Sequence, residues 1–364
     1  MMTGSPAMPP LDPAPVVSRF EFWPAWRFYP PVWAWLVLLA IRHRGLRLPL
    51  LANPSFPAGG LVGESKSQIL DLVGGDARQW VAPYIAFDRG EDDAATTATR
   101  ARAAMTAAGL SLPVVAKPDL GCRGAGVRPV RDGDQLVAYL AAFPAGHRLL
   151  LQQMVDVEGE AGVFYVRPPG AAQGHIFSLT LKHFPHVVGD GRSTLRALIL
   201  ADPRAGPLHH LYFHRHPDRL DLVVAAGERV RLAFAGSHSR GAIFRDGARH
   251  ITPELTARFD QIARAIPEFH FGRFDVRFGD FAAFQRGEGF RIVEVNGAGA
   301  EATHIWDSRM RLRDAYRVLF TQFRWLFAIG AANRQRGFQP DRWRDFIRLW
   351  QLERRLVRLY PPTA

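Results

Sequence analysis

The sequence has a single cysteine, Cys122, and no long run of apolar residues. One thiol cannot form an intramolecular disulfide or a multi-cysteine zinc site, so we expect a reducing, cytoplasmic setting. The apolar segment 31–41 is shorter than the about 20 residues that a membrane-spanning helix needs. No small-residue cleavage site follows it, which argues against a signal peptide. The G-x-S-x-G and H-E-x-x-H motifs are also missing, so neither a serine hydrolase nor a zinc metalloprotease is expected.

Two interpretations of the segment 31–41 stay open. The first is a buried helix or a prop between two lobes. The second is a peripheral anchor at the inner face of a membrane, because tryptophans beside basic residues suit the headgroup region of a bilayer. These tryptophans are Trp23, Trp26, Trp33 and Trp35.

Acidic residues are fewer than basic ones, with 34 Asp and Glu against 46 Lys and Arg, a formal net charge of +12 and a pI near 10.7. Anionic partners are therefore expected, such as nucleotides, acidic lipids and carboxylated or phosphorylated substrates. The arginines are spread along the chain, so we expect no dedicated nucleic-acid partner. An arginine-rich binder of anionic lipid or nucleic acid stays a competing hypothesis, which strongly salt-dependent binding would support.

Hydrophobic patterning predicts an α+β protein with hairpin-like strand pairs rather than a regular βαβ repeat. The predicted strands are 110–116, 148–154, 162–167, 175–181, 229–234, 272–278 and 289–295. The predicted helices are one that begins at Ser65, then 92–108, 132–143, 253–266 and an amphipathic region from Asp307 to Leu359. Proline and small residues predict a disordered N-terminus over 1–18.

A lysine at the end of a predicted strand leads directly into a glycine-rich loop. The strand VVAKP delivers Lys117, and the loop GCRGAG follows at 121–126. Glycines let backbone amides approach phosphate oxygens, and a lysine supplies a point charge for the same phosphates. The loop is neither a Walker A motif nor a Rossmann fingerprint, and by itself it could be an ordinary turn.

Two later strands carry a set of hard oxygen ligands. In GRFDVR the side chains of Arg273 and Asp275 share one face, and in RIVEVN those of Glu294 and Asn296 share one face. If the strands are neighbours, these oxygens converge. Such ligands suit Mg²⁺, which takes its remaining coordination from water and phosphates, so we predict a metal site.

A histidine cluster, by contrast, is predicted to be a solvated loop. His209, His210, His214 and His216 lie in HHLYFHRH, but no nearby cysteine or clear carboxylate completes a zinc site.

Together these motifs resemble the ATP-grasp superfamily, in the layout of D-alanine–D-alanine ligase and of the ligase domain of cyanophycin synthetase. The resemblance covers about 66–307. It implies an ATP-grasp fold of two α+β lobes that grip ATP, with an aromatic N-terminal region at 19–108 and a helical C-terminal tail at 311–364. The ATP-grasp domain would be 109–310, with a nucleotide-binding lobe at 109–175 and a magnesium-binding lobe at 176–310.

The resemblance also implies roles for particular residues. Lys66 in GESK and Lys117 would contact the phosphates with the loop glycines Gly121, Gly124 and Gly126. Gln153, where the family usually has glutamate, and Val155 would face the adenine, and Glu160 would bind the ribose hydroxyls. The segment 187–195, VVGDGRSTL, is similar to the GDG-x-x-T segment of the cyanophycin-synthetase-like branch.

At the reaction centre, the resemblance makes Asp275, Glu294 and Asn296 the ligands of Mg²⁺, or of Mn²⁺ in its place. Arg273 would stabilise the transferred phosphoryl group. Lys182 and Arg240 are further candidates to face the substrate.

The function predicted is that of an ATP- and Mg²⁺-dependent, ADP-forming ligase that joins a small-molecule or peptide carboxylate to an amine through an acylphosphate. Two alternatives stay open: an ATP-grasp kinase that phosphorylates a hydroxyl, and a nucleotide-binding protein without turnover. The sequence does not name the acid or the amine.

Overall fold

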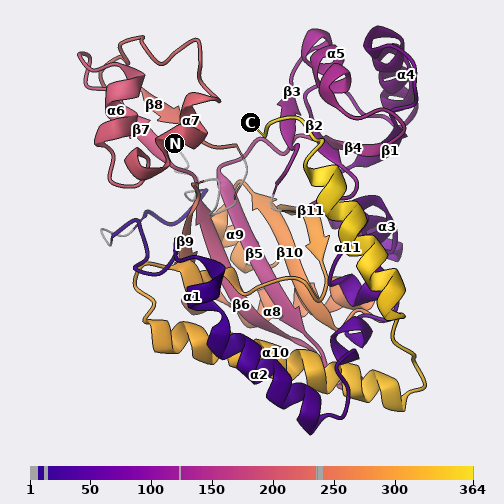
Figure 1. The fold of residues 1–364 in the computed structure, drawn as a ribbon. Coiled ribbons are helices and arrows are strands. Elements are labelled where there is room, and N and C mark those ends of the chain that lie inside the picture. The colour runs from indigo at the N-terminus through magenta and orange to yellow at the C-terminus, as the bar shows by residue number, and fades with distance from the viewer. Residues whose placement is uncertain (1–6, 12–14, 123, 235, 237–240, 364) are drawn as a thin grey trace.

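The computed structural model describes residues 7–11, 15–122, 124–234, 236 and 241–363, and it has a mixed α+β fold built on antiparallel sheets (Figure 1). The α-helices are α1 (Ala25–Phe28), α2 (Pro30–Arg42), α3 (Lys66–Asp71), α4 (Ala94–Ala107), α5 (Gly133–Ala142), α6 (Leu195–Ala201), α7 (His209–Phe213), α8 (Pro253–Arg264), α9 (Phe281–Gln285), α10 (Leu312–Gln335) and α11 (Trp343–Val357). The strands are β1 (Tyr84–Asp88), β2 (Val114–Pro118), β3 (Arg128–Val130), β4 (Arg148–Gln153), β5 (Gly159–Val166), β6 (His175–His183), β7 (His186–Val188), β8 (Arg229–Arg231), β9 (Ile243–Asp246), β10 (Phe271–Phe278) and β11 (Phe290–Asn296).

Two larger sheets and a two-stranded one organise the chain. The central sheet has the order β11-β10-β5-β6-β9, the upper right lobe of Figure 1 has the order β1-β4-β2-β3, and β7 pairs with β8 in the upper left lobe. All the pairs are antiparallel. A parallel bridge between Val81 and Ile292 joins the upper right lobe to the edge of the central sheet.

The central sheet packs against apolar clusters on both of its faces. In β5, Val163 packs into the cluster that contains Phe259 of α8, whereas its neighbour Phe164 packs into the cluster that contains Leu326 of α10. Successive side chains of a strand point to opposite faces, so this alternation lets one strand serve two cores.

Helix starts follow the local sequence. Ser65 caps α3, Asp93 caps α4 and Thr252 caps α8, each by accepting a hydrogen bond from a backbone N–H of the first turn. The predicted helices at 92–108, 132–143 and 253–266 therefore agree with α4, α5 and α8 to within a few residues.

The sequence patterns failed in several places. The histidine segment that was predicted to be a solvated loop forms the short helix α7 over His209–Phe213, with Tyr212 buried. The strand predicted at 110–116 begins only at Val114, because Pro113 has no N–H to donate to a ladder. The helical region predicted from Asp307 to Leu359 is divided, since Gly337 has a φ of 95° between α10 and α11. The short strands β1, β3, β7 and β9 were not predicted. These strands are too short to show a clear hydrophobic pattern, and they form because each one pairs with a neighbouring strand.

The segment 31–41 forms α2, as expected for a helix, but the interpretation of a buried helix is wrong for one of its faces. Val32 and Leu39 are buried against α10, while Trp33, Leu38 and Ile41 are exposed. No helix of the described part of the chain is long and apolar enough to span a bilayer.

The described residues near the start of the chain contact the rest of the molecule, and Met8 already packs against the cluster that contains Phe259. The carbonyls of Pro15 and Val16 accept hydrogen bonds from Arg245 and Arg204. Glu21 forms an ion pair of 2.8 Å with Arg204, and both side chains are buried. The division into domains predicted from the sequence stays a prediction.

Candidate active site

A cavity of about 730 Å³ lies where the upper right lobe, the central sheet and the start of α3 meet. Most of the residues predicted from the sequence line it. They are Lys66, Lys117, Gly121, Gly124, Gln153, Val155, Glu160, Lys182, Arg273, Asp275, Glu294 and Asn296. Gly126 is outside the lining, and Arg240 lies outside the described residues.

The chain has few lysines, and all of them line this cavity. The sequence has three lysines, Lys66, Lys117 and Lys182, among its 46 basic residues, and each of them lines the cavity. A lysine is a compact point charge with rotatable donors, whereas arginine presents a planar fork, so the two are not interchangeable at a phosphate. This bias is visible in the sequence alone.

Lys117 is held at the end of β2 by two acceptors. Its Nζ donates to Gln152 Oε1 at 2.7 Å and to the Val293 carbonyl at 2.8 Å, so it reaches from one sheet to the other. Burial lowers the pKa of Lys117 to about 8, although the carboxylate of Glu294 opposes this. Gln152, next to the predicted Gln153, is the residue that orients the lysine.

Lys66 lies at the first position of α3, where Asp119 ties that helix to the glycine loop. The Asp119 carboxylate accepts hydrogen bonds from Ser65 Oγ and from the backbone N–H of Ser67. The Lys66 Nζ donates to the Gly121 carbonyl at 2.6 Å and lies 3.7 Å from Glu294 Oε1. The two lysines and the loop are therefore positioned together, although 51 residues separate Lys66 from Lys117, as 117 − 66 = 51.

Strands β10 and β11 bring the predicted acids into register. Asp275 lies opposite Glu294, and Arg273 lies opposite Asn296. Arg273 grips Asp275 with two hydrogen bonds, of 2.9 and 3.1 Å, and Lys182 Nζ donates to the same carboxylate at 2.9 Å. Burial alone would raise the pKa of Asp275, but Arg273 and Lys182 outweigh it and lower it to about 2.

Glu160 belongs to the same buried cluster. Its carboxylate accepts from Lys182 at 3.1 Å and from Arg277 at 3.0 Å. With Arg273 and Asp275, the cluster has three cationic and two anionic side chains, so it presents an excess of positive charge to the cavity. The ribose-binding role of Glu160 stays a prediction.

The donor set fits magnesium by its chemistry. Asp275, Glu294 and Asn296 offer two carboxylates and an amide oxygen, and Asn296 Nδ2 lies 3.3 Å from Asp275 Oδ2. Such hard ligands suit Mg²⁺ with phosphate oxygens and water completing its coordination. In the part of the chain that the structure describes, no group of three or more His, Cys, Asp or Glu side chains could hold a metal ion. The histidines of α7 are therefore not part of such a group.

Glu64 is a partly buried acid two residues before Lys66. Its Oε1 accepts the Gly297 N–H at 2.7 Å. Burial raises the pKa of Glu64 to about 8 despite that hydrogen bond. Gly60 and Gly297 pack against it so closely that a Cβ on either would lie within 2.8 Å of its Oε1. Glu64 thus fixes the segment before Lys66 to the end of β11.

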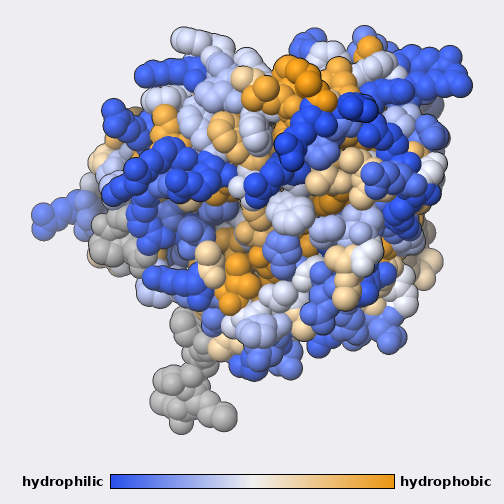
Figure 2. Space-filling view, turned by 90° about the horizontal axis from the view of Figure 1, so that it is seen from below, coloured by the Kyte–Doolittle hydropathy of each residue, from blue (hydrophilic) through white to orange (hydrophobic). Residues whose placement is uncertain are grey.

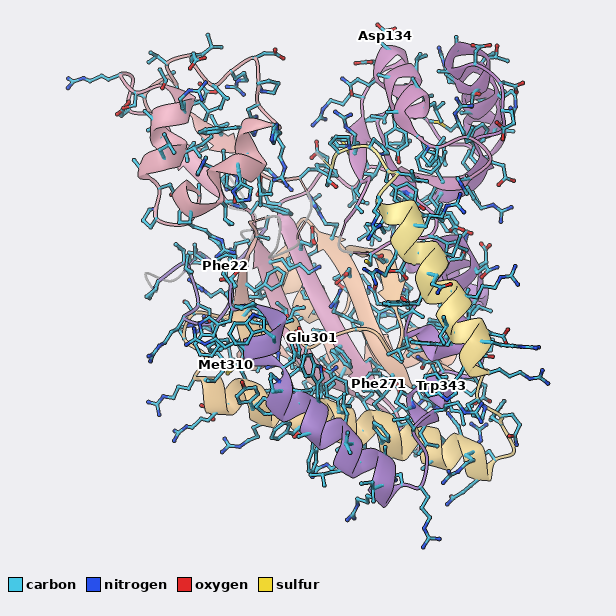
Figure 3. The ribbon with its side chains drawn as sticks, in the orientation of Figure 1. Phe22, Asp134, Phe271, Glu301, Met310 and Trp343 are labelled. Atoms are coloured by element: carbon cyan, nitrogen blue, oxygen red, sulfur yellow. The ribbon has the colours of Figure 1, made fainter. Side chains whose placement is uncertain are left out.

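The two ends of the cavity differ in chemistry. Around the base of the glycine loop the lining is aliphatic, with Val115, Val127 and Val293 beside Gln153 and Val155. The opposite end is aromatic, with Trp23, Tyr29, Phe244 and Trp306 in the lining. There Tyr29 donates a hydrogen bond of 3.0 Å to Glu301, which Figure 3 labels near the centre of the molecule. Arg273 Nη1 donates to the Glu301 carbonyl at 3.0 Å and so connects this end to the acidic pair.

No family model and no curated protein matches the chain by sequence. Among solved structures, it is similar to a D-alanine–D-alanine ligase from Bacillus anthracis, with 12% identity over 78% of this chain and 72% of the other and a TM-score of 0.43. The ATP-grasp ligase PsnB is 14% identical over 71% of this chain and 60% of its own, with a TM-score of 0.36. A bifunctional glutathione synthetase from Pasteurella multocida is 17% identical over 72% of this chain, with a TM-score of 0.33, and the chain spans 38% of its length.

All three similarities are at 17% identity or less and have TM-scores of 0.43 or less. The evidence for a function therefore comes from the side chains of the cavity.

Proposed function

We propose that the protein binds ATP and Mg²⁺ in this cavity and joins a carboxylate to an amine, with release of ADP and phosphate. The observation that carries this proposal is the convergence of all three lysines with Arg273, Asp275 and Glu294 on one cavity. Phosphoryl transfer needs cations on the phosphates and an acceptor held in line. The lysines and Arg273 are such cations, and Asp275 and Glu294 can hold a further cation, Mg²⁺.

The nucleotide would lie between β2, the glycine loop and β11. Lys66 and Lys117 would hold the phosphates, and the aliphatic lining beside Gln153 and Val155 would cover the base. Asp275, Glu294 and Asn296 would hold Mg²⁺, which neutralises charge on the phosphates when it is bound.

The reaction would have two steps. A substrate carboxylate oxygen attacks the γ-phosphorus, the bond to the bridging oxygen breaks, and ADP leaves. The amine nitrogen then attacks the acyl carbon of the acylphosphate, loses a proton, and phosphate leaves as the C–O bond breaks. Arg273 and Lys182 would stabilise the negative charge that develops on the transferred group and on the acyl oxygen.

This chemistry would require water to be kept away from the acylphosphate, which hydrolyses if water reaches it. The glycine loop, whose Gly121 and Gly124 line the cavity, would cover the phosphates. The acceptor would bind at the aromatic end, next to Glu301 and Arg273.

The test is isothermal titration with a non-hydrolysable ATP analogue, with and without Mg²⁺. We expect Mg²⁺-dependent binding that Asp275→Asn/Glu294→Gln loses. The control is Asp134→Asn/Glu288→Gln, which makes the same change in charge at two exposed positions away from the cavity. Glu294→Gln alone, at a partly exposed position, serves if the double variant does not fold.

Binding that is equal in all variants, or absent from all of them, contradicts the proposal. If binding is confirmed, pairs of acids and amines are screened for ADP release. A new amide supports the ligase, whereas a stable phosphoester identifies the kinase. Binding without turnover over a broad screen identifies a nucleotide-binding protein.

A further inference from the structure

Helix α2 is apolar around its whole circumference, although only one of its faces is covered. The covered face packs on α10 through Val32 and Leu39, and Trp35 Nε1 donates to the Phe320 carbonyl at 2.9 Å. The exposed face carries Trp33, Val37, Leu38 and Ile41, which are 50, 56, 57 and 69% exposed. A helix with no polar face is normally buried in a core or in lipid. The exposed face of α2 is therefore in contact with no protein core in the described part of the chain.

Trp26, in the neighbouring helix α1, is 71% exposed and adds to this surface. We call the surface formed by Trp26, Trp33, Val37, Leu38 and Ile41 the α2 face. Figure 2 shows the molecule from below, the side on which α2 and α10 lie in Figure 1, and orange apolar patches there are bordered by blue hydrophilic residues.

The segment that forms the α2 face carries charge of one sign. The segment 22–63 contains no Asp or Glu, and it carries Arg27, Arg42, Arg44 and Arg47. Arg42 and Arg44 are exposed at the end of α2, directly after the apolar stripe. Long basic side chains beside tryptophans suit the boundary between lipid headgroups and acyl chains, because their stems are apolar and their heads reach the phosphates.

Helix α11 begins near this surface and also exposes apolar side chains. Arg47 Nη1 donates to the Asp341 carbonyl at 3.2 Å, which joins the end of α2 to the start of α11. Trp343, labelled in Figure 3, is 45% exposed, as is Ile347 one turn further on. Exposed apolar side chains thus continue beyond α2.

We propose that the α2 face docks the protein on an anionic lipid surface. The helix has 13 residues, which is about 20 Å at 1.5 Å per residue, so it is too short to cross a bilayer and would lie along the headgroups. The apolar stripe would enter the acyl boundary, and the arginines would pair with lipid phosphates.

Other occupants explain less of the surface. Nucleic acid would use the arginines but would leave the tryptophan stripe in water. A second copy of the chain would bring the same patch against itself, and the arginines of the two copies would meet with no acid in 22–63 to pair with them.

The test is co-sedimentation of the full chain with phosphatidylcholine vesicles, with and without phosphatidylglycerol. We expect binding to the anionic vesicles that decreases as salt rises. Trp33→Gln/Leu38→Gln/Ile41→Gln removes the apolar stripe and should lower the partition coefficient by at least about tenfold. Arg42→Gln/Arg44→Gln should lower it on the order of 30-fold at low salt.

The matched control is Leu200→Gln/Leu222→Gln/Val223→Gln, which replaces exposed apolar residues of the upper left lobe. It should bind vesicles like the unaltered chain. Thermal unfolding of every variant checks that the fold is kept, since all the replaced side chains are exposed. No binding to anionic vesicles, or an equal loss in the control, overturns the proposal. A concentration-dependent dimer that only the α2 variant loses also overturns it and assigns the face to a second copy.

Discussion

The hydroxyl of Tyr360 donates a hydrogen bond to the carbonyl of Leu120, 2.7 Å away. This contact joins the C-terminal segment to the start of the glycine loop. The Tyr360 ring stacks on Phe143 with a centroid distance of 5.5 Å, and a Cβ at Gly126 would lie 3.1 Å from the Cβ of Tyr360. Thr363 Oγ1 also donates to the Gly124 carbonyl at 2.8 Å. The end of the chain thus packs over the loop, where Figure 1 places the C-terminus beside β2 and β3.

We expect replacement of Tyr360 to weaken nucleotide binding. Tyr360→Phe removes a hydrogen bond worth about 1 kcal/mol and should raise the Kd for an ATP analogue several-fold. Tyr360→Ala also removes the ring that orders the loop and should raise the Kd by roughly tenfold or more. Titration calorimetry measures both. Leu359→Ala, at the exposed neighbouring residue, is the control, and an unchanged Kd in Tyr360→Ala would show that the tail does not order the loop.

Lys182 neutralises two buried carboxylates, so its removal should destabilise the fold. Lys182→Met leaves Glu160 and Asp275 with less positive charge, and we expect a loss of about 3–5 kcal/mol in the free energy of unfolding. Urea denaturation measures this loss. In Glu160→Gln/Lys182→Met the combined loss should be smaller than the sum of the two single losses, because both single variants break the same pair. Additive losses would contradict a coupled cluster.

Glu268 should make stability depend on pH. Arg336 grips its carboxylate with hydrogen bonds of 2.6 and 2.9 Å and, against the opposing effect of burial, lowers its pKa to about 2. A carboxyl whose pKa is lower in the folded state stabilises the fold above its ordinary pKa of 4.5, and this contribution is lost as the pH falls towards 2. The pair is partly exposed, so we expect about 1 kcal/mol after solvent screening.

Glu268→Gln should therefore lower the free energy of unfolding at pH 7, and the difference from the unaltered chain should shrink below about pH 4.5. Denaturation at pH 7 and at about pH 2.5 measures it. The control is Glu228→Gln, which removes a more exposed partner of Arg219 and should cost less. A difference that does not change with pH would contradict the assignment.

Cys122 reports on the proposed nucleotide site. It is exposed and lines the cavity within the glycine loop. Alkylation adds a group where the phosphates would lie, so we expect it to abolish nucleotide binding. Bound ATP analogue with Mg²⁺ should slow the alkylation, which mass spectrometry follows. Cys122→Ser should bind nucleotide and resist the reagent. Alkylation at an equal rate with and without nucleotide would contradict the placement.

The elements with strong local signals could be predicted from the sequence. Apolar strand patterns located β4, β5, β6, β10 and β11, and the helix predicted at 92–108 agrees with α4. The alternation within GRFDVR and RIVEVN predicted that Asp275 and Glu294 would converge if their strands are neighbours, and β10 and β11 do pair with these two residues opposite each other. Lys117 was predicted from the strand and its glycine loop, and Lys66 from the family resemblance; both line the cavity.

Only the tertiary structure decided how these residues are held. Asp119, Gln152 and Glu64 orient the lysines and the loop through contacts across long separations in the chain, which no local pattern encodes. The tail residue Tyr360 reaches the loop only because α11 crosses the molecule. The sequence determined which chemical groups are present and on which face of a strand they lie. Packing determined which of them meet and which face of α2 stays exposed, because burial depends on what lies opposite.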